Sequence, residues 1–166
     1  PAFPWRGRIT CHPAPGYAGT VDKTAAAATQ MGAFFGSATA AQFAVTADSV
    51  SFTGTPTDWG IRRMILHYAH LCEVAGGVDA FLIGSEMPGI TQVRQNATTS
   101  YPAVTRYSTL ATDVRGILRA GTEISYAADW SEYHSHRPAS EPSTVIFNLD
   151  PLWANPAIDF IGIDNY

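Results

Sequence analysis

Three short apolar runs in this chain each end in an acidic residue. The runs are VDAFLIGSEM (78–87), EISYAADW (123–130) and AIDFIGIDNY (157–166), and the acids are Glu86, Asp129 and Asp164. Apolar runs of this length, bounded by turn residues, are typical of buried β-strands. A carboxylate at the end of a buried strand is costly unless it is solvated, paired or used in a site. The three acids therefore ask for a common explanation.

The segments between these runs supply that explanation. Apolar residues at helical spacing predict one helix over 57–77 and a second over 103–121, each ended by a glycine. The resulting order of helix, strand, helix, strand and strand is typical of a parallel sheet with crossover helices. Ligands bind at the carboxyl ends of the strands in such folds. We therefore expect Glu86, Asp129 and Asp164 to line one rim.

The first third of the chain has a different pattern. Residues 1–20 are rich in proline and glycine and are predicted to form a loop. Asp22 is a candidate N-cap for a helix that runs to about Phe35, because the segment is rich in alanine. Alternating apolar residues on both sides of a polar TADS segment predict a hairpin over 42–54.

A partial barrel is the fold class that these observations favour. The chain has no G-x-G-x-x-G dinucleotide motif and no phosphate-binding loop. Strands that end in acids without glycine-rich turns favour a (β/α)₈ barrel over a doubly wound sheet. A complete barrel needs about 250 residues, whereas this chain has 166 and begins PAFPWRG without a methionine. We expect a piece of a longer protein that contains only part of a barrel.

Composition excludes several classes of partner. The net charge of −4 and the absence of a basic run argue against nucleic acid. No apolar run approaches the roughly 18 residues of a membrane span. Cys11 and Cys72 are isolated from each other and from any histidine pair, so they are expected to be free thiols rather than zinc ligands. We predict neither a metal nor a cofactor.

Five motifs in order carry a resemblance to a known family. They are PWRGRI (4–9), WGIRRMILHYAHL (59–71), AFLIGSEM, ISYAADWSEY and IDFIGIDNY. Together they resemble the glycoside hydrolase-like TIM-barrel domain of gene transfer agent and phage tail proteins, which are baseplate or host specificity proteins. They are more distantly similar to retaining endo-β-mannanases. The resemblance implies that residues 1–166 hold about strands 4 to 6 of the barrel, with a helix-hairpin insertion at about 22–54.

The resemblance also implies a set of site residues. By position, Glu86 is the general acid/base of a retaining glycoside hydrolase, a role for a carboxyl group at a half-buried strand end. The nucleophile of the mannanases lies on the strand after Tyr166. The expected substrate-binding residues are Trp5, Arg6, Asp129, Trp130, Asp164 and Tyr166. A loop-capping role is an open alternative for Asp164.

Two departures from the family pattern, and one alternative role, bear on activity. Ser85 stands where many related glycosidases carry asparagine, and Asp129 stands where the mannanases carry asparagine. An extra carboxylate at the rim raises the pKa of a neighbouring acid or binds something other than a neutral sugar. The alternative for Glu86 is an ion pair with Arg6 and no catalysis. Glu132 is expected to face solvent.

Two functions remain open from the sequence. The first is a glycoside hydrolase-like domain in the tail or baseplate of a phage or gene transfer agent particle, which acts on cell-envelope glycan. The second is a non-catalytic barrel that serves as a structural or glycan-binding module of the tail. The partners in either case are a polysaccharide, other tail proteins and the remainder of the parent chain. An isolated piece of a barrel would have open sheet edges, so we expect poor solubility of residues 1–166 alone.

Overall fold

A parallel three-stranded sheet is the centre of the fold in the computed structural model, which describes residues 4–166. The strands are β3 (Ala80–Ser85), β4 (Glu123–Asp129) and β5 (Gly162–Asp164), in the spatial order β3-β4-β5. All three run in the same direction, so their carboxyl ends lie at one edge. The expected parallel sheet is confirmed, and the described residues contain no closed barrel.

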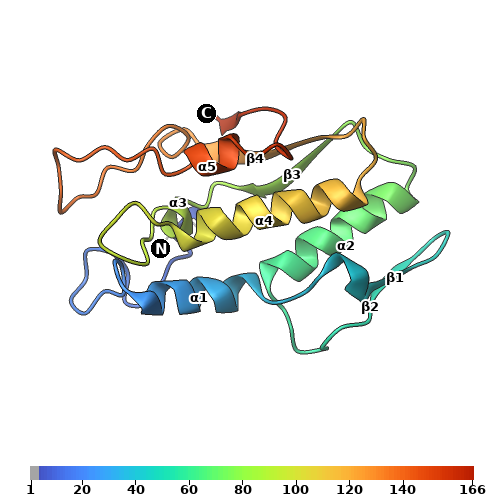
Figure 1. Cartoon of the computed structure of the whole chain (residues 1–166), viewed down its shortest axis with the longest axis horizontal. Helices are drawn as coiled ribbons and strands as arrows, with labels where there is room; N and C mark the ends of the chain where they lie inside the picture. Colours follow the sequence, from blue (N-terminus) through green and yellow to red (C-terminus); the bar gives the residue numbers. More distant parts are fainter. Residues whose placement is uncertain (1–3) are drawn as a thin grey trace.

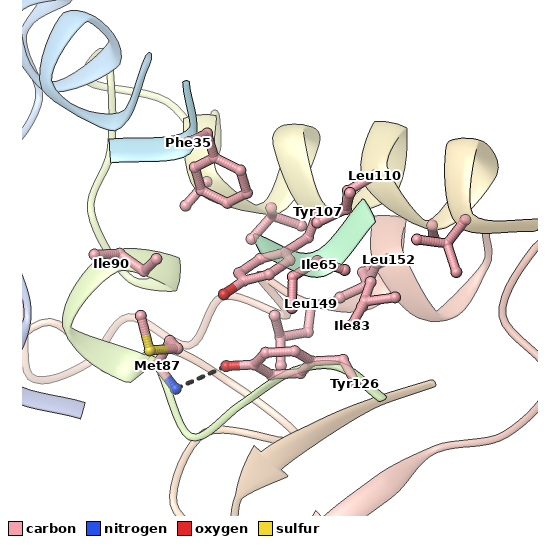
Figure 2. Packing of buried hydrophobic residues seen from close by; sticks show 14 of the residues in the cluster. Phe35, Ile65, Ile83, Met87, Ile90, Tyr107, Leu110, Tyr126, Leu149 and Leu152 are labelled. Carbon is pink, nitrogen blue, oxygen red and sulfur yellow. Dashed lines mark hydrogen bonds between the residues drawn. The ribbon is translucent and has the colours of Figure 1, made fainter. Parts of the chain in front are cut away.

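Two crossover helices cover one face of this sheet (Figure 1). Helix α2 (Ile61–Val74) precedes β3, and helix α4 (Pro102–Ile117) connects β3 to β4. The core between helices and sheet includes the rings of Tyr107 and Tyr126, whose centroids are 5.1 Å apart and whose planes are tilted at 49° (Figure 2). Each large apolar side chain buried here contributes about 1.5–3 kcal/mol to stability. Packing against the helices therefore fixes which face of each strand is buried.

The opposite face of the sheet is open. In β3 the side chains alternate, with Phe81 and Ile83 buried under the helices and Leu82 46% exposed on the other face. The second strand, β4, is buried along almost its whole length. In a parallel sheet both faces are normally covered. The exposed face is consistent with part of a TIM-barrel-like domain.

The N-terminal part forms a helix and a hairpin beside α2. Helix α1 (Ala25–Phe35) is followed by the antiparallel pair β1 (Phe43–Val45) and β2 (Val50–Phe52). The helix and hairpin expected in this region are present, but their origin as an insertion stays a prediction. The remaining elements are short: η1 (Arg6–Arg8), η2 (Ala40–Gln42), α3 (Pro88–Thr91) and α5 (Asp150–Trp153).

Some boundaries differ from the sequence-based expectation because side chains take over backbone hydrogen bonds. Helix α1 begins after Thr24 rather than at Asp22, whose carboxylate instead accepts hydrogen bonds from Arg94 at 2.7 and 2.9 Å. Strand β5 is shorter than the apolar run 157–166. The Asp159 carboxylate accepts the N–H of Ile124 at 2.7 Å, so regular pairing with β4 starts only at Gly162.

Candidate functional site

Glu86 lies directly after β3, at the carboxyl edge of the sheet. Its side chain is 7% exposed. Its φ angle is +50°, in the left-handed region that non-glycine residues seldom adopt. The N–H of Glu86 donates to the carbonyl of Ala127 in β4 at 2.8 Å, so the strained residue is still held by the sheet. Strain of this kind often accompanies a functional position.

Two side chains from the N-terminal segment approach one oxygen of Glu86. The Trp5 indole N–H donates to Oε2 at 2.9 Å, and the Arg6 guanidinium lies 3.1 Å from the same oxygen. Arg6 also donates to the carbonyl and to the hydroxyl of Ser85, both at 2.7 Å. The ion pair considered as an alternative role for Glu86 is therefore present. Its guanidinium is half-exposed, so solvent or a ligand can reach it.

Ser85 connects Glu86 to the third strand. Its hydroxyl accepts the hydrogen bond from Arg6 and donates to Asp164 Oδ2 at 2.7 Å. The residue that departs from the related glycosidases thus joins Arg6 to Asp164 across the rim.

Asp129 and Tyr166 close the other side of the rim. Asp129 is paired with Asp164 across neighbouring strands, and its Oδ1 accepts the N–H of Ser131 at 2.8 Å. The Tyr166 hydroxyl donates to Asp129 Oδ2 at 3.5 Å. The pKa of Tyr166 is raised, first by hydrogen bonding to Glu86 and then by burial. Tyr166 is therefore close to two of the three rim acids.

The structure brings six of the seven predicted site residues into one connected cluster. Through the contacts above, Trp5, Arg6 and Glu86 join Asp164, Asp129 and Tyr166. The seventh, Trp130, follows Asp129 and is 55% exposed. Exposed aromatic rings beside acids offer flat apolar surfaces with polar edges, which suit the faces of sugars.

A groove starts at this cluster. It has a volume of about 670 Å³ and begins at Arg6 and Met87, next to the Glu86 site. It continues along Ile9 and Met64 to the exposed ring of Trp59. The groove is mainly apolar, and it adjoins the rim at Arg6.

Glu132 was expected to face solvent, and this expectation is wrong. Its side chain is fully buried beneath the rim, where it accepts hydrogen bonds from Tyr126 at 3.0 Å and from the N–H of Asp129 at 3.1 Å. Burial raises the pKa of this carboxyl to about 7. The spacing Asp-x-x-Glu in DWSE is a capping-box pattern, in which the glutamate reaches back to the first residue's N–H. That pattern could have revealed the contact with the Asp129 N–H, but not the burial of Glu132.

Neither a metal site nor a membrane span is found in residues 4–166. No group of three or more His, Cys, Asp or Glu side chains there is placed to hold a metal ion. No helix within the same residues is long and apolar enough to cross a bilayer. Both cysteines are free thiols.

A parallel sheet, crossover helices on one face and acids at the carboxyl ends together define part of a TIM-barrel-like α/β domain. Residues 59–166 match the model of the GTA TIM-barrel-like domain, and the chain belongs to this gene transfer agent family. The matched segment contains all three parallel strands and Glu86, whereas Trp5 and Arg6 lie before it. A comparison with curated proteins finds no match.

Proposed function

We propose that this chain is a glycoside hydrolase-like domain in the tail or baseplate of a gene transfer agent or phage particle. Its substrate would be a cell-envelope glycan, cleaved by a retaining mechanism with two carboxylates. Glu86 would be the acid/base, and the nucleophile would follow Tyr166. The tail location and the contacts with other tail proteins belong to the same proposal.

The observation that carries the proposal is the convergence at Glu86. The Trp5 indole N–H and the Arg6 guanidinium both contact the Glu86 carboxylate, although Glu86 lies 81 positions after Trp5 in the chain. The cluster lies at the carboxyl edge of the sheet, which is where α/β barrels bind ligands. Its members combine carboxylates with exposed aromatic rings, the two groups that sugar recognition and glycosidic bond cleavage require.

The contacts of Glu86 suggest how a glycan would enter. Both donors, Trp5 and Arg6, approach Oε2. A glycosidic oxygen would take a proton from the other oxygen, Oε1, or would replace one of these two donors at Oε2. Arg6 is the one free to move, because its side chain is half-exposed and, within residues 4–166, is held only by Glu86 and Ser85. Asp164 and Asp129 would then hold sugar hydroxyls rather than attack the anomeric carbon.

A second candidate function is a non-catalytic glycan-binding or structural module of the tail. The Arg6–Glu86 ion pair favours it, because a permanently paired carboxylate neither donates nor accepts a proton. The two candidates make the same prediction for glycan binding and differ for cleavage.

The test compares the full-length protein with its Glu86→Gln variant. The substrates are host envelope polysaccharide, peptidoglycan and β-mannan, and the readout is the appearance of new reducing ends. Loss of general acid/base catalysis lowers the rate by about 10²–10⁴-fold. The matched control is Glu123→Gln, because Glu123 is an exposed glutamate at the opposite end of β4. Glycan binding without release by the unmodified protein would instead establish the non-catalytic module.

A further inference from the structure

A single buried carboxylate contacts the end of β4 and the short helix α3 that follows Glu86. Glu132 lies after β4 and is fully buried. Its Oε1 accepts from the Thr91 hydroxyl and, at 3.0 Å, from the Tyr126 hydroxyl. Its Oε2 accepts the N–H of Asp129 at 3.1 Å. Three donors, one from α3 and two from β4, thus contact one side chain that has no cationic partner among the described residues.

Tyr126 extends this network to the residue after Glu86. Its hydroxyl oxygen accepts the N–H of Met87 at 2.7 Å (Figure 2). A tyrosine hydroxyl has one hydrogen to donate. Because Met87 N–H can only donate, the hydroxyl must direct its own hydrogen elsewhere, and Glu132 is the acceptor. Glu132 therefore sets the direction in which Tyr126 presents its lone pair.

Glu86 depends on such external support. Its left-handed backbone is unfavourable for a glutamate and persists only where surrounding contacts fix it. The N–H of Glu86 is held by Ala127, and the next N–H, of Met87, is held by Tyr126. Releasing the second contact would let the peptide after Glu86 rotate toward a common conformation. The carboxylate would then move away from Trp5 and Arg6.

We propose that Glu132 is a positioning residue that holds Glu86, through Tyr126 and Met87, and Asp129, through its N–H, in the geometry of the rim. The catalytic consequence rests on the proposed function, whereas the effect on backbone geometry does not.

The network can keep its geometry when Glu132 carries a proton. The Thr91 hydroxyl has a second acceptor, the carbonyl of Met87 at 3.2 Å. It can therefore turn toward that carbonyl and accept a hydrogen from the protonated carboxyl. The same exchange allows glutamine at position 132 to donate its NH₂ to Thr91 while its oxygen keeps Tyr126 and the N–H of Asp129. Glutamine should thus retain the positioning that an apolar side chain removes.

The first readout is hydrogen exchange at the Met87 amide, measured by mass spectrometry on the full-length protein. Tyr126→Phe removes only the hydroxyl, and Glu132→Leu removes the carboxylate. Both are expected to speed exchange in peptides that contain Met87 at least tenfold, while Glu132→Gln stays within about threefold of the unmodified protein. Peptides from the β1–β2 hairpin report on global opening and should not change.

The second readout is glycan release with kcat and KM measured separately. Tyr126→Phe is expected to lower kcat at least tenfold and to change KM less than threefold. At position 132, Glu132→Leu should lower kcat in the same way, whereas the conservative Glu132→Gln should retain it. If the unmodified protein releases no glycan, the proposed function fails and exchange at Met87 still decides the positioning role. If Glu132→Leu does not fold, Tyr126→Phe decides. Exchange that rises everywhere or nowhere in Tyr126→Phe would overturn the proposal.

Discussion

The rim around Glu86 and the cluster around Arg94 each contain an ion pair that joins distant segments of the chain. The two differ in which partner of the pair is buried. In the rim the acid is buried and the cation is exposed, with side-chain exposures of 7% for Glu86 and 50% for Arg6. In the second cluster the cation is buried, because Arg94 is 3% exposed and contacts Asp22 at 2.9 Å and Glu141 at 3.1 Å.

This difference separates a site from a structural clamp. An exposed arginine can leave a buried carboxylate when a ligand replaces it. A buried arginine cannot leave, because an unpaired charge in the interior costs several kcal/mol. Arg94 joins the N-terminal loop at Asp22 to the loop after β4 at Glu141. We infer that the clamp maintains the fold, while the rim is arranged to exchange partners.

The largest expected effect tests this contrast directly. Arg94→Met leaves the carboxylates of Asp22 and Glu141 without their shared cation, and the free energy of unfolding should fall by about 3–5 kcal/mol. Arg6→Met removes a half-exposed cation, and the buried Glu86 keeps the Trp5 N–H, so the loss should be smaller, about 1–3 kcal/mol. Both losses are measured by urea unfolding of the full-length protein, with hydrogen exchange in β3 and β4 as the readout.

Arg119→Met is the matched control for an exposed pair. Arg119 contacts Glu73 at 3.1 Å, and both side chains are partly exposed at 48% and 26%, so its loss should be the smallest of the three, below about 1 kcal/mol. Equal losses for the Arg6 and Arg94 variants would erase the distinction between rim and clamp.

The second prediction concerns the support beneath the rim. The pKa of Glu132 is raised by burial to about 7 from a usual value of 4.5. The folded protein therefore binds more protons than the unfolded chain between these values, and stability falls as pH rises from 4.5 to 7. A shift of this size corresponds to roughly 3 kcal/mol. Glu132→Gln should remove that fall, so its urea midpoint relative to the unmodified protein should increase from pH 5 to pH 8. A constant difference would contradict the raised pKa.

The positions of the rim acids could be predicted from the sequence because their causes are local. An apolar run followed by an acid marks the end of a buried strand, and helical spacing between the runs makes the strands parallel. Glu86, Asp129 and Asp164 therefore reach one edge, as expected. The resemblance to a known family added Trp5 and Arg6, and it added the assignment of the three strands as barrel strands 4 to 6, which stays a prediction.

The support of the rim and the clamp could not be predicted in the same way, because burial of a charge depends on partners far along the chain. Asp22 has the sequence pattern of a helix cap, but Arg94, 72 positions away, binds its carboxylate. Glu132 has the pattern of a surface residue in a polar loop. Its burial depends on Thr91, 41 positions away. A local pattern shows that a carboxylate needs donors, and only the fold shows which donors reach it.

The third prediction is that the stability of the cluster around Arg94 depends on pH with a sign opposite to that expected for Glu132. Burial and then the charge of Arg94 lower the pKa of His136 from 6.5 to about 4, while Asp22 and Glu141 partly oppose this. The folded state binds fewer protons than the unfolded chain between these values, so stability is lost as pH falls from 6.5 to 4. The expected loss is roughly 2–3 kcal/mol. Glutamine at position 136 can still bond the Tyr101 hydroxyl, which lies 3.0 Å from the imidazole Nδ1. His136→Gln should therefore remove the loss of unfolding free energy between pH 6.5 and pH 4, measured with urea. The change near neutral pH, which Glu132 causes, should remain. Retention of the full loss at acid pH would mean that other groups cause it.

The smallest expected effect concerns the hydrogen bond from Trp5 to Glu86, the second donor at the rim. Trp5→Phe keeps an aromatic ring beside Glu86 and removes only the indole N–H that donates to Oε2 at 2.9 Å. Because this hydrogen bond is partly exposed, its loss should lower the free energy of unfolding by only about 1 kcal/mol. A loss of the same size in transition-state stabilisation is about a fivefold decrease in kcat/KM for glycan release. Trp59→Phe is the matched control, because Trp59 is an exposed ring at the far end of the groove and is stacked on Arg63 at 4.1 Å. It should alter KM alone, and only for long glycans. Trp5→Phe could instead lower the free energy of unfolding as strongly as Arg94→Met. In that case Trp5 would be a structural contact like Arg94, and the contrast between an exchangeable rim and a fixed cluster at Arg94 would be contradicted.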